Sequence, residues 1–508
     1  MKISIISPNL SGCVSILDCG VTYLATYINE RTPHRATIWD YTFRRKYWKR
    51  YLASKFASDK PDAIGITFTT LYEGYVRDSV NFIRANLSKD IPIIVGGIHP
   101  TLKPKDALEI EGVNVVILGE GEEALAEVLD AIEGKQGFEG ITGAAYIGDN
   151  GEPVENPRRP WIKDINALPF PNYDLWEDIE KYFYFLGQLW LIGTRGCPYS
   201  CTNCEELPLR EAVPGCRYRI RDPGNYVQEI QYHYEKYKDI GFRMAHPFDP
   251  VFPLNREWTR EFCSEYIKSG LHKKLPFSIF SRGDTFFINS SPDKFDEERL
   301  KWLAEAGCKE IRVGIEAGSE RMRNKIHQKN VSDEQLRLSF QNFKKYNMLT
   351  MAYNMLGGPT ETKAELKQTF RMNVRFNPNK PIFFIYQELT HDLYGMGLLV
   401  QDHETATTSV IKIKSKKNSL VRKTQDQTTI QFGEPIESEH YSKQWLMAFQ
   451  GFCYFYFVGR RILKLIYRQR HRFFINFVKY MYRGYKEGAN TKIVFAYFLS
   501  ACGDNLFS

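Results

Sequence analysis

The segment 193-GTRGCPYSCTNCEE-206 decides how the centre of this chain is read, because it holds three cysteines at C-x3-C-x2-C spacing. These are Cys197, Cys201 and Cys204. Two glycines and a proline surround the first cysteine, so we expect a loop that follows a strand. Thiolates are soft ligands that suit zinc, copper(I) or iron–sulfur clusters. The spacing therefore predicts a metal-binding loop.

The number of ligands separates the candidate metals. Structural zinc takes four ligands, usually as two pairs, and no second pair follows in the next sixty or so residues. Cys216 and His233 are candidates for a fourth ligand, but neither has paired spacing. A 4Fe–4S cluster normally takes four cysteines, so three would leave one iron open to a substrate or cofactor. We favour such a cluster; zinc and an unliganded loop are the alternatives.

The composition bounds the class of protein. The chain has 508 residues, of which 43% are hydrophobic, and a net charge of +8. This is globular, with room for about three domains. The excess of positive charge lies mainly in the last hundred residues, so nucleic-acid binding is not expected. The start, MKISIISPNL, lacks the features of a secretory signal. We therefore expect a cytoplasmic, reducing compartment, where clustered cysteines usually bind metal or react.

Short apolar strands alternate with helices in the first 140 residues. Strands are expected at 2–7, 36–41, 63–69, 91–97 and 113–119, which predicts a Rossmann-like parallel sheet with helices on both faces. Ligands of such sheets bind at the carboxyl ends of the strands. Glycine-rich loops follow two of these strands and are candidates to contact a large cofactor: Gly96, Gly97, Gly119, Glu120 and Gly121. The alternative is a cofactor-free domain with ordinary turns.

The rest of the chain divides by composition. Residues 137–174 are rich in Pro, Gly and Asn, and Asp149-Asn150-Gly151 predicts a hairpin. Alternation resumes from 188 to about 390, which predicts an open, partial barrel. The helix over 296–307 has an aspartate cap and a terminal glycine. We expect five regions: 1–140, a linker over 141–185, the barrel over 186–400, a polar linker or insert over 401–438, and a helical C-terminal region over 439–508.

The motifs resemble those of a known family. GCPYSCTNC resembles the signature of radical S-adenosylmethionine (radical SAM) enzymes, and VGIEAGSERM (313–322) and NMLGGPTET (354–362) resemble later motifs of that family. Residues 1–140 are similar to the cobalamin-binding domain that is often fused ahead of it, with IIVGGIHPT and ILGEGE in the expected order. The resemblance implies an α/β protein: a cobalamin-binding domain, a partial (β/α)6 TIM-like radical SAM barrel, and a helical C-terminal region.

The resemblance also implies cofactors and a reaction. The cofactors are a 4Fe–4S cluster, S-adenosylmethionine and cobalamin. S-adenosylmethionine would chelate the open iron and be cleaved reductively to a 5′-deoxyadenosyl radical. The expected outcome is methylation of an unactivated carbon of a small or lipid-like substrate through methylcobalamin. The first alternative is oxidative cyclisation or ring rearrangement, as in the anaerobic porphyrin-ring cyclase. A non-catalytic metal-binding protein is the second.

Residue roles follow from the resemblance position by position. The three cysteines would bind the cluster. The residues expected near S-adenosylmethionine are Asp249, Arg282, Glu316, Gly357 and Gly358. Each has a plainer alternative: a turn-capping aspartate, a solvated arginine, a surface carboxylate and an ordinary glycine turn. Asn203 departs from the family, which usually has an aromatic residue there, near the adenine.

Two further expectations concern partners and cobalt. The loop over 8–20 has no histidine, so we expect cobalamin without a protein histidine ligand to cobalt; His99 would be structural or near the nucleotide tail, and Cys13 or Cys19 is a weaker candidate ligand. An electron donor such as flavodoxin or ferredoxin is implied. The aromatic and basic tail over 453–488 predicts a helical cap over the barrel or, alternatively, a peripheral membrane contact.

Overall fold

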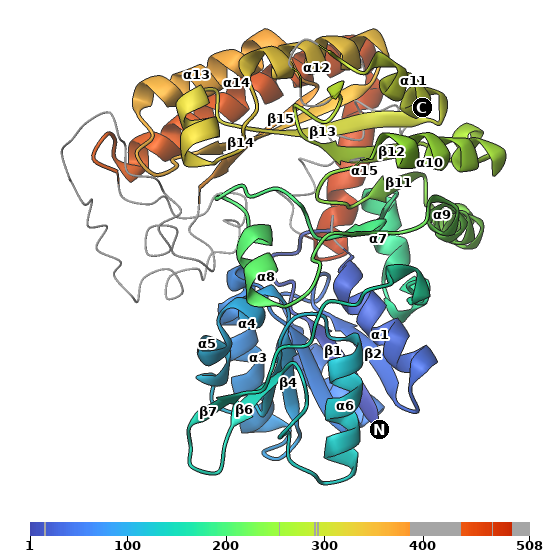
Figure 1. Cartoon of the computed structure of the whole chain (residues 1–508), viewed down its shortest axis with the longest axis vertical. Helices are drawn as coiled ribbons and strands as arrows, with labels where there is room; N and C mark the ends of the chain where they lie inside the picture. The colour runs from blue at the N-terminus through green and yellow to red at the C-terminus, as the bar shows by residue number, and fades with distance from the viewer. Residues whose placement is uncertain are drawn as a thin grey trace. The chain divides into compact units, whose positions relative to one another are not determined.

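The computed structural model describes residues 1–489 except 15–16, 253–254, 289–290, 292–293, 387–437 and 470. The expected polar insert over 401–438 therefore lies outside the described residues, apart from its last residue. The chain forms two compact units (Figure 1). Within the described residues, unit 1 contains Met1–Gly187, Pro208–Arg221 and residues 477–489, and unit 2 contains Gln188–Leu207 and Asp222–Asn476.

Unit 1 is built on a seven-stranded sheet in the order β2-β1-β3-β4-β5-β6-β7. The first five strands pair in parallel, as expected for a Rossmann-like domain. The last two form the predicted hairpin and pair antiparallel onto β5, so this stretch adds an edge to the sheet. The strands are β1 (Lys2–Ser7), β2 (Arg35–Asp40), β3 (Ala63–Thr67), β4 (Ile93–Gly96), β5 (Val115–Ile117), β6 (Ala144–Ile147) and β7 (Pro153–Glu155).

Helices cover both faces of this sheet. One apolar core joins strand residues such as Ile64 and Val95 to α2 (Trp48–Asp59), α3 (Glu73–Asn86) and α5 (Pro104–Leu108). The helices α1 (Cys19–Arg31) and α6 (Glu122–Glu133) contact each other and contribute nothing to that core, so they cover the other face (Figure 1). A short helix, α4 (Ile98–Leu102), begins directly after β4.

Unit 2 is built on a six-stranded sheet in the order β15-β14-β13-β12-β11-β8, paired in parallel throughout. This is the expected open half-barrel. Strand β11 has only four residues, too few to give a periodic pattern in the sequence. The strands are β8 (Gln188–Leu191), β11 (Met244–Pro247), β12 (Phe277–Ser281), β13 (Cys308–Glu316), β14 (Leu349–Leu356) and β15 (Lys380–Ile385).

The helices between these strands start at well-formed caps. Asp296 accepts a hydrogen bond from the Arg299 amide at the start of α11, as predicted. Capping boxes open α12 and α13, through Ser332 and Thr362. The helices of this layer are α9 (Pro223–Tyr237), α10 (Arg256–Lys268), α11 (Glu297–Glu305), α12 (Asp333–Lys345) and α13 (Lys363–Phe376).

The tail is helical, as expected. It forms α14 (Lys443–Gln469) and α15 (His471–Lys486). In unit 2, α14 packs on β15, where Leu446 and Phe457 share an apolar core with Phe383. The Gln450 side chain donates a hydrogen bond to the Phe383 carbonyl at 2.7 Å. In the described part of the chain, no helix has the length and apolar character needed to cross a membrane.

Candidate functional site

The cysteine loop lies between β9 (Thr194–Arg195) and α8 (Glu206–Ala212). Cys197 is buried, and Cys201 and Cys204 are partly buried. Burial raises the pKa of the Cys197 thiol and raises that of Cys204 to about 12. Since the thiolate is the form that binds metal, uptake of a metal centre at this loop must release protons.

The donor set fits a multi-iron cluster better than a single ion. Among the described residues, the only group of three His, Cys, Asp or Glu side chains close enough to share one ion is His34, Asp130 and Glu133. The three cysteines of the loop do not form such a group. One zinc ion needs its ligands in a tight tetrahedron, whereas a cube of irons and sulfides separates them more widely. Three soft donors on one loop therefore fit the cluster.

Hydrogen bonds from outside the loop hold its first half. The buried carboxylate of Asp249, which follows β11, accepts hydrogen bonds from the amides of Gly193 and Thr194 at 2.9 and 2.5 Å, and from the Thr194 hydroxyl at 2.9 Å. An aspartate that accepts three hydrogen bonds fixes the chain just before Cys197. The structure thus gives Asp249 a positioning function for the cysteine loop.

The second half of the loop is held by the segment after β13. The Thr202 amide donates to the His327 carbonyl at 3.1 Å, and the Thr202 hydroxyl donates to the Ile326 carbonyl at 2.6 Å. Beside it, the Asn203 amide nitrogen lies 3.1 Å from the Met355 sulfur. The buried Asn203 Oδ1 has no hydrogen-bond partner among the described residues. Asn203 therefore offers a polar atom at the position where the family usually places a ring.

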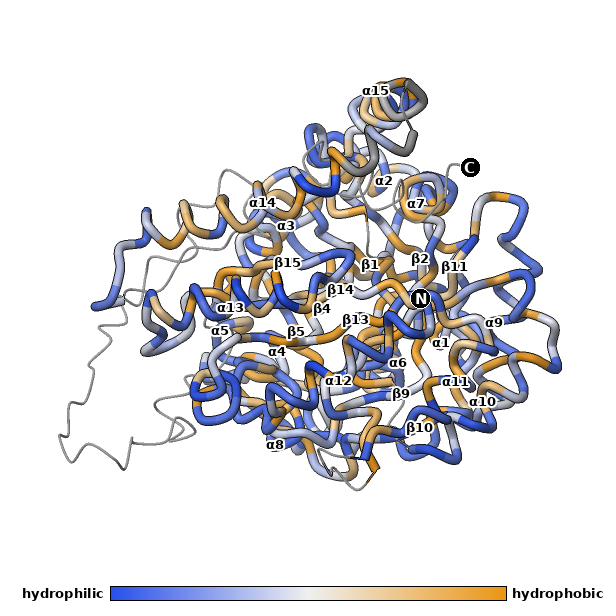
Figure 2. Tube along the Cα trace, turned by 90° about the horizontal axis from the view of Figure 1, so that it is seen from above, coloured by the Kyte–Doolittle hydropathy of each residue, from blue (hydrophilic) through white to orange (hydrophobic). Residues whose placement is uncertain are grey.

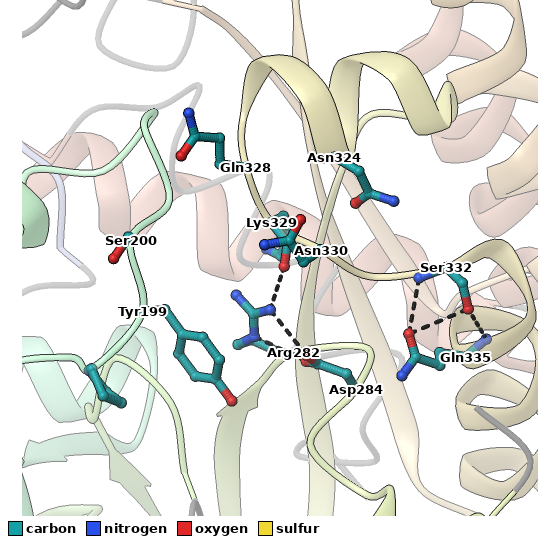
Figure 3. A pocket seen from close by; sticks show the side chains of 11 residues that line it. Tyr199, Ser200, Arg282, Asp284, Asn324, Gln328, Lys329, Asn330, Ser332 and Gln335 are labelled. Atoms are coloured by element: carbon teal, nitrogen blue, oxygen red, sulfur yellow. Dashed lines mark hydrogen bonds and ion pairs between the residues drawn. The ribbon is translucent and has the colours of Figure 1, made fainter. Parts of the chain in front are cut away.

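Arg282, the residue after β12, touches the loop directly. Its Nη1 donates to the Cys201 sulfur at 3.3 Å, and its guanidinium lies 3.6 Å from the centre of the Tyr199 ring. Two hydrogen bonds of 2.9 and 3.0 Å join it to the Asp284 carboxylate (Figure 3). A guanidinium so placed stabilises negative charge on the sulfur. The prediction that Arg282 lies at the site, and not in solvent, is consistent with its 5% exposure.

A cavity of about 590 Å³ opens beside Arg282 and the loop residues Tyr199 and Ser200. Most of the residues that line it have polar side chains, which Figure 3 shows. Pro198 of the loop and Asp284 also line it, and the other lining residues come from the segment after β13 and the start of α12: Asn324, Gln328, Lys329, Asn330, Ser332 and Gln335. The cavity is therefore suited to a small polar molecule next to the cysteine loop.

Two opposite charges face each other at the end of β13. The Lys329 ammonium donates to the Glu316 carboxylate at 2.6 Å, and both side chains are mostly buried. Glu316 has φ +63°, a strained conformation for a residue other than glycine and one that is often found at functional sites. A Cβ on Gly314 would lie 2.3 Å from Glu316 Oε1 and 2.5 Å from Lys329 Nζ. Gly314 thus leaves the space that this ion pair occupies.

The glycine pair after β14 encloses a buried acid. The amides of Gly357 and Gly358 donate to Glu361 Oε2 at 2.7 and 3.1 Å. The other oxygen, Oε1, has no hydrogen-bond partner among the described residues. Burial raises the pKa of Glu361 to about 8, against the opposing effect of the two amides. A Cβ on Gly357 would meet Leu446 at 2.5 Å, so the glycine is also needed for packing.

In unit 1 the glycine-rich edge is closely packed. Gly97 has φ +120°, and a Cβ there would lie 2.7 Å from the Phe68 carbonyl oxygen. Gly96 ends β4, and Gly121 precedes α6. The Gly119 amide donates to the Thr101 hydroxyl at 2.9 Å. These contacts explain the glycines through packing; their contact with a cofactor stays a prediction.

The Glu120 side chain is hydrogen-bonded to groups within unit 1. Its carboxylate accepts hydrogen bonds from Arg219 at 2.8 and 3.0 Å and from the Ile162 amide at 2.7 Å. Both charged side chains are mostly buried. The contacts give Glu120 a structural function, since it ties two distant segments of the unit to the loop after β5.

Two features of the same edge fit a large, mostly apolar cofactor. His99 is 2% exposed and stacks on Phe68 at 4.3 Å; its Nδ1 lies 3.1 Å from the Thr70 hydroxyl, and its Nε2 has no partner among the described residues. Leu71 and Ile98, which follow β3 and β4, are 45% and 36% exposed. His99 Nε2, a polar atom without a partner among the described residues, and the exposed side chains of Leu71 and Ile98 would suit the rim of a cobalamin site.

Family models match both units. A B12-binding domain matches residues 15–129, and the radical SAM superfamily matches residues 191–372. The chain therefore carries the two domains of cobalamin-dependent radical SAM proteins, as the motifs predicted. These domains bring three cofactors, a 4Fe–4S cluster, S-adenosylmethionine and cobalamin.

Curated relatives match part of the chain. The chain is 28% identical over 316 residues to an uncharacterized methyltransferase of Pyrococcus horikoshii. That alignment covers 61% of this chain and 63% of the relative. It is 27% identical over 341 residues to the anaerobic magnesium-protoporphyrin IX monomethyl ester cyclase of Rubrivivax gelatinosus, covering 65% and 57%. The chain thus spans about three fifths of the length of these curated relatives.

Solved structures share the fold. The radical S-adenosylmethionine methyltransferase TsrM of Kitasatospora setae, with cobalamin and a [4Fe–4S] cluster bound, matches with a TM-score of 0.62 and 21% identity, covering 76% of this chain and 72% of that one. The cobalamin-dependent S-adenosylmethionine radical enzyme OxsB matches with a TM-score of 0.62 and 17% identity, covering 73% and 51%.

Several residues of the site carry no sequence signal by themselves. Lys329, Asp284 and Glu361 are ordinary charged residues in the sequence, and only folding brings them to the cysteine loop, the cavity and the glycine pair. Lys329 and Glu361 do lie close to the later family motifs, seven residues after 313–322 and within 354–362. Reading every charged residue in and just after those motifs would have found both.

Proposed function

We propose that this protein cleaves S-adenosylmethionine reductively and methylates an unactivated carbon of a small or lipid-like substrate, with the cluster supplying the electron and cobalamin the methyl group. The observation that carries the proposal is the cysteine loop, with Arg282 on Cys201 and a polar cavity beside both. Methyltransferases among the relatives support it. Oxidative cyclisation without methyl transfer is the second candidate, supported by the cyclase relatives.

The chain's own residues would bind and orient S-adenosylmethionine. The opposed charges of Lys329 and Glu316 match the carboxylate and ammonium of its methionyl end. Asn203 Oδ1 can accept a hydrogen bond from the adenine amino group. Arg282 holds its positive guanidinium against the Cys201 sulfur. This charge would stabilise the electron-rich form of the metal centre. An electron donor such as flavodoxin or ferredoxin would supply the electron.

We also propose a peripheral membrane contact through the tail. On α15, Val478, Tyr482 and Tyr485 are 63–66% exposed, and the exposed cations Lys479 and Lys486 lie beside them at helical spacing. Figure 2 shows apolar and polar segments alternating along α14, on which Phe455, Leu463 and Tyr467 are 69–85% exposed. Apolar side chains flanked by cations are typical of helices that lie in a membrane interface. Co-sedimentation with phosphatidylglycerol vesicles, but not with neutral vesicles, would support this contact.

Anaerobic reconstitution followed by product analysis tests the reaction. The protein is loaded with iron, sulfide and cobalamin and incubated with S-adenosylmethionine, a reductant and candidate substrates. Methylation predicts S-adenosylhomocysteine together with 5′-deoxyadenosine. Deoxyadenosine with a cyclised or rearranged product, and no S-adenosylhomocysteine, would favour the cyclase-like reaction. Absence of both products with a fully loaded cluster would contradict both.

A further inference from the structure

One face of the unit 2 sheet carries a row of aromatic side chains. Along β14, Met351, Tyr353 and Met355 are partly exposed, whereas the alternate residues are buried. One of those buried residues, Leu356, packs in the core with α14. Because successive side chains of a strand point to opposite faces, the partly exposed set lies on the face away from that core, which we name the inner face.

Four of the rings come from different strands, and the fifth comes from the residue directly after β11. Trp190 of β8 stacks on Phe248, just after β11, at 4.1 Å between ring centres, and Phe248 meets Phe280 of β12 edge-on at 5.7 Å. Phe280 lies 5.8 Å from Tyr353 of β14, which stacks on Phe384 of β15 at 6.0 Å. We call these five residues the aromatic belt. Phe248 is 39% exposed and the other four are partly exposed, so the belt is not a filled core.

A polar network lies on one side of the belt. Glu310 accepts hydrogen bonds from Arg312 at 2.8 Å and Lys380 at 2.7 Å, and Arg312 lies 2.9 Å from the His246 ring nitrogen. The Arg312 guanidinium is 5.6 Å from the Phe280 ring. Since these buried charges are joined to one another, the surface that the belt presents is mainly ring faces and edges.

The cysteine-loop site lies on the other side. Arg282 is two residues beyond Phe280 along the chain, a rise of about 7 Å for extended backbone. In β13, Glu316 stands four residues beyond Arg312. A molecule seated on the belt would thus lie next to the residues proposed to hold S-adenosylmethionine.

We propose that the aromatic belt binds a flat aromatic ring system of the substrate and presents it to the cysteine-loop site; this rests on the proposed function. Offset and edge-to-face packing are the arrangements that aromatic pairs prefer, and the belt already shows both between its own rings. An aliphatic chain gains area from such a surface but no ring–ring geometry, so it would bind less selectively. Within the proposed range of small or lipid-like substrates, the belt thus favours one that carries an aromatic ring system.

Equilibrium binding to the full, reconstituted chain tests the belt without requiring turnover. The probes are protoporphyrin IX, followed by its Soret band, and farnesol as an aliphatic competitor. The variants Phe280→Leu and Tyr353→Leu keep apolar volume and remove one ring each. We expect each to weaken protoporphyrin binding about tenfold or more, which corresponds to about 1.4 kcal/mol. Farnesol should compete weakly and be little affected by the substitutions.

The control removes a stacked ring elsewhere in unit 2. Phe340 of α12 stacks on Phe376 at 5.1 Å in the helical layer and is 1% exposed. Phe340→Leu should lower thermal stability but leave protoporphyrin binding unchanged. Iron and sulfide content, measured on every sample, identifies any variant that has simply failed to fold.

Three outcomes would overturn the proposal: belt variants that bind protoporphyrin like the wild type, farnesol that binds as tightly as protoporphyrin and weakens in parallel, or a Phe340→Leu variant that loses binding as strongly. The failure of the proposed function is separable. If the wild-type chain binds protoporphyrin through the belt but never yields deoxyadenosine, the proposal for the belt stands and the proposed radical reaction fails.

Discussion

The cysteine loop of unit 2 and the glycine-rich edge of unit 1 both lie at the carboxyl ends of parallel strands, where ligands of such sheets bind, but they are built differently. In the loop, charged and polar side chains from other strands hold the backbone: Asp249 holds Gly193 and Thr194, and Arg282 contacts Cys201. At the glycine edge, backbone meets backbone, as where Gly97 lies against Phe68.

The difference shows what each kind of site demands. A metal cluster needs a few donor atoms held in place, so polar supports surround the loop. A large cofactor would need broad, close surfaces, which the glycines and apolar side chains of the edge would offer. Substitutions of the loop cysteines should therefore remove chemistry and leave the fold intact, while substitutions at the edge should first reduce stability.

The largest effect is expected from Cys201→Ala. Loss of one of three ligands should remove most of the bound iron and reduce both deoxyadenosine and S-adenosylhomocysteine below detection. Cys216→Ala, at an exposed cysteine, should retain iron and both products. Loss of the cluster in Cys216→Ala would instead indicate a fourth ligand and a structural metal site.

The ion pair at the end of β13 should govern affinity for S-adenosylmethionine. Lys329→Met removes the ammonium that lies 2.6 Å from Glu316 and leaves a carboxylate that repels the methionyl carboxylate. We expect the KM for S-adenosylmethionine to rise by about tenfold to a hundredfold, in line with the loss of a charge-assisted hydrogen bond, with iron content unchanged. An unaltered KM would place the cosubstrate elsewhere.

Asp249 should act through the loop and not on the cosubstrate. Asp249→Ala leaves two buried amides without an acceptor, at a cost of about 1–3 kcal/mol each, and should reduce iron incorporation several-fold. Asp249→Asn keeps an oxygen acceptor and should recover most of the iron incorporation. Equal loss in the two variants would mean that the negative charge itself is needed.

At the glycine edge, Gly97→Ala should lower the free energy of unfolding by about 3 kcal/mol, because a Cβ meets the Phe68 carbonyl oxygen at φ +120°. At Gly74 of α3, an added Cβ would have no atom within 4 Å. Gly74→Ala should therefore be neutral or stabilise the fold by up to about 1 kcal/mol. Thermal unfolding and cobalamin absorbance measure both. If Gly97→Ala no longer binds cobalamin but unfolds at the same temperature as the wild type, Gly97 contacts the cofactor directly, and the contrast with the loop fails.

The effect expected at Glu361 depends on pH. Its pKa rises from 4.5 in the unfolded chain to about 8 in the folded protein, because of burial. The folded state therefore holds the extra proton between these values, so stability falls as pH increases from about 5 to 8, by at most about 1.4 kcal/mol per pH unit. Glu361→Gln, which still accepts from the glycine amides, should flatten this dependence and raise the melting temperature at pH 8 but not at pH 5. Equal melting curves at both pH values would contradict it.

The spacing of motifs indicated where in the chain the sites lie. It did not indicate what each residue of a site contacts. Three cysteines in one loop are local, and so are strands such as β13, so both could be read from the sequence. The contact of Arg282 with Cys201 and the pair of Glu316 with Lys329 depend on tertiary packing, which no local pattern reports. Glu120 was expected near a cofactor, but its bonds to Arg219 and Ile162 arise from residues far away in the chain.

The central claim is that three cysteines hold a cluster whose fourth iron is open to S-adenosylmethionine. Electron paramagnetic resonance of the reduced, reconstituted protein, recorded with and without S-adenosylmethionine, tests it most directly. We predict a reduced 4Fe–4S signal whose g-values shift when S-adenosylmethionine is added, with the shift weakened in Lys329→Met. A signal that does not respond to S-adenosylmethionine, or a protein that retains zinc and shows no cluster signal, would contradict the claim.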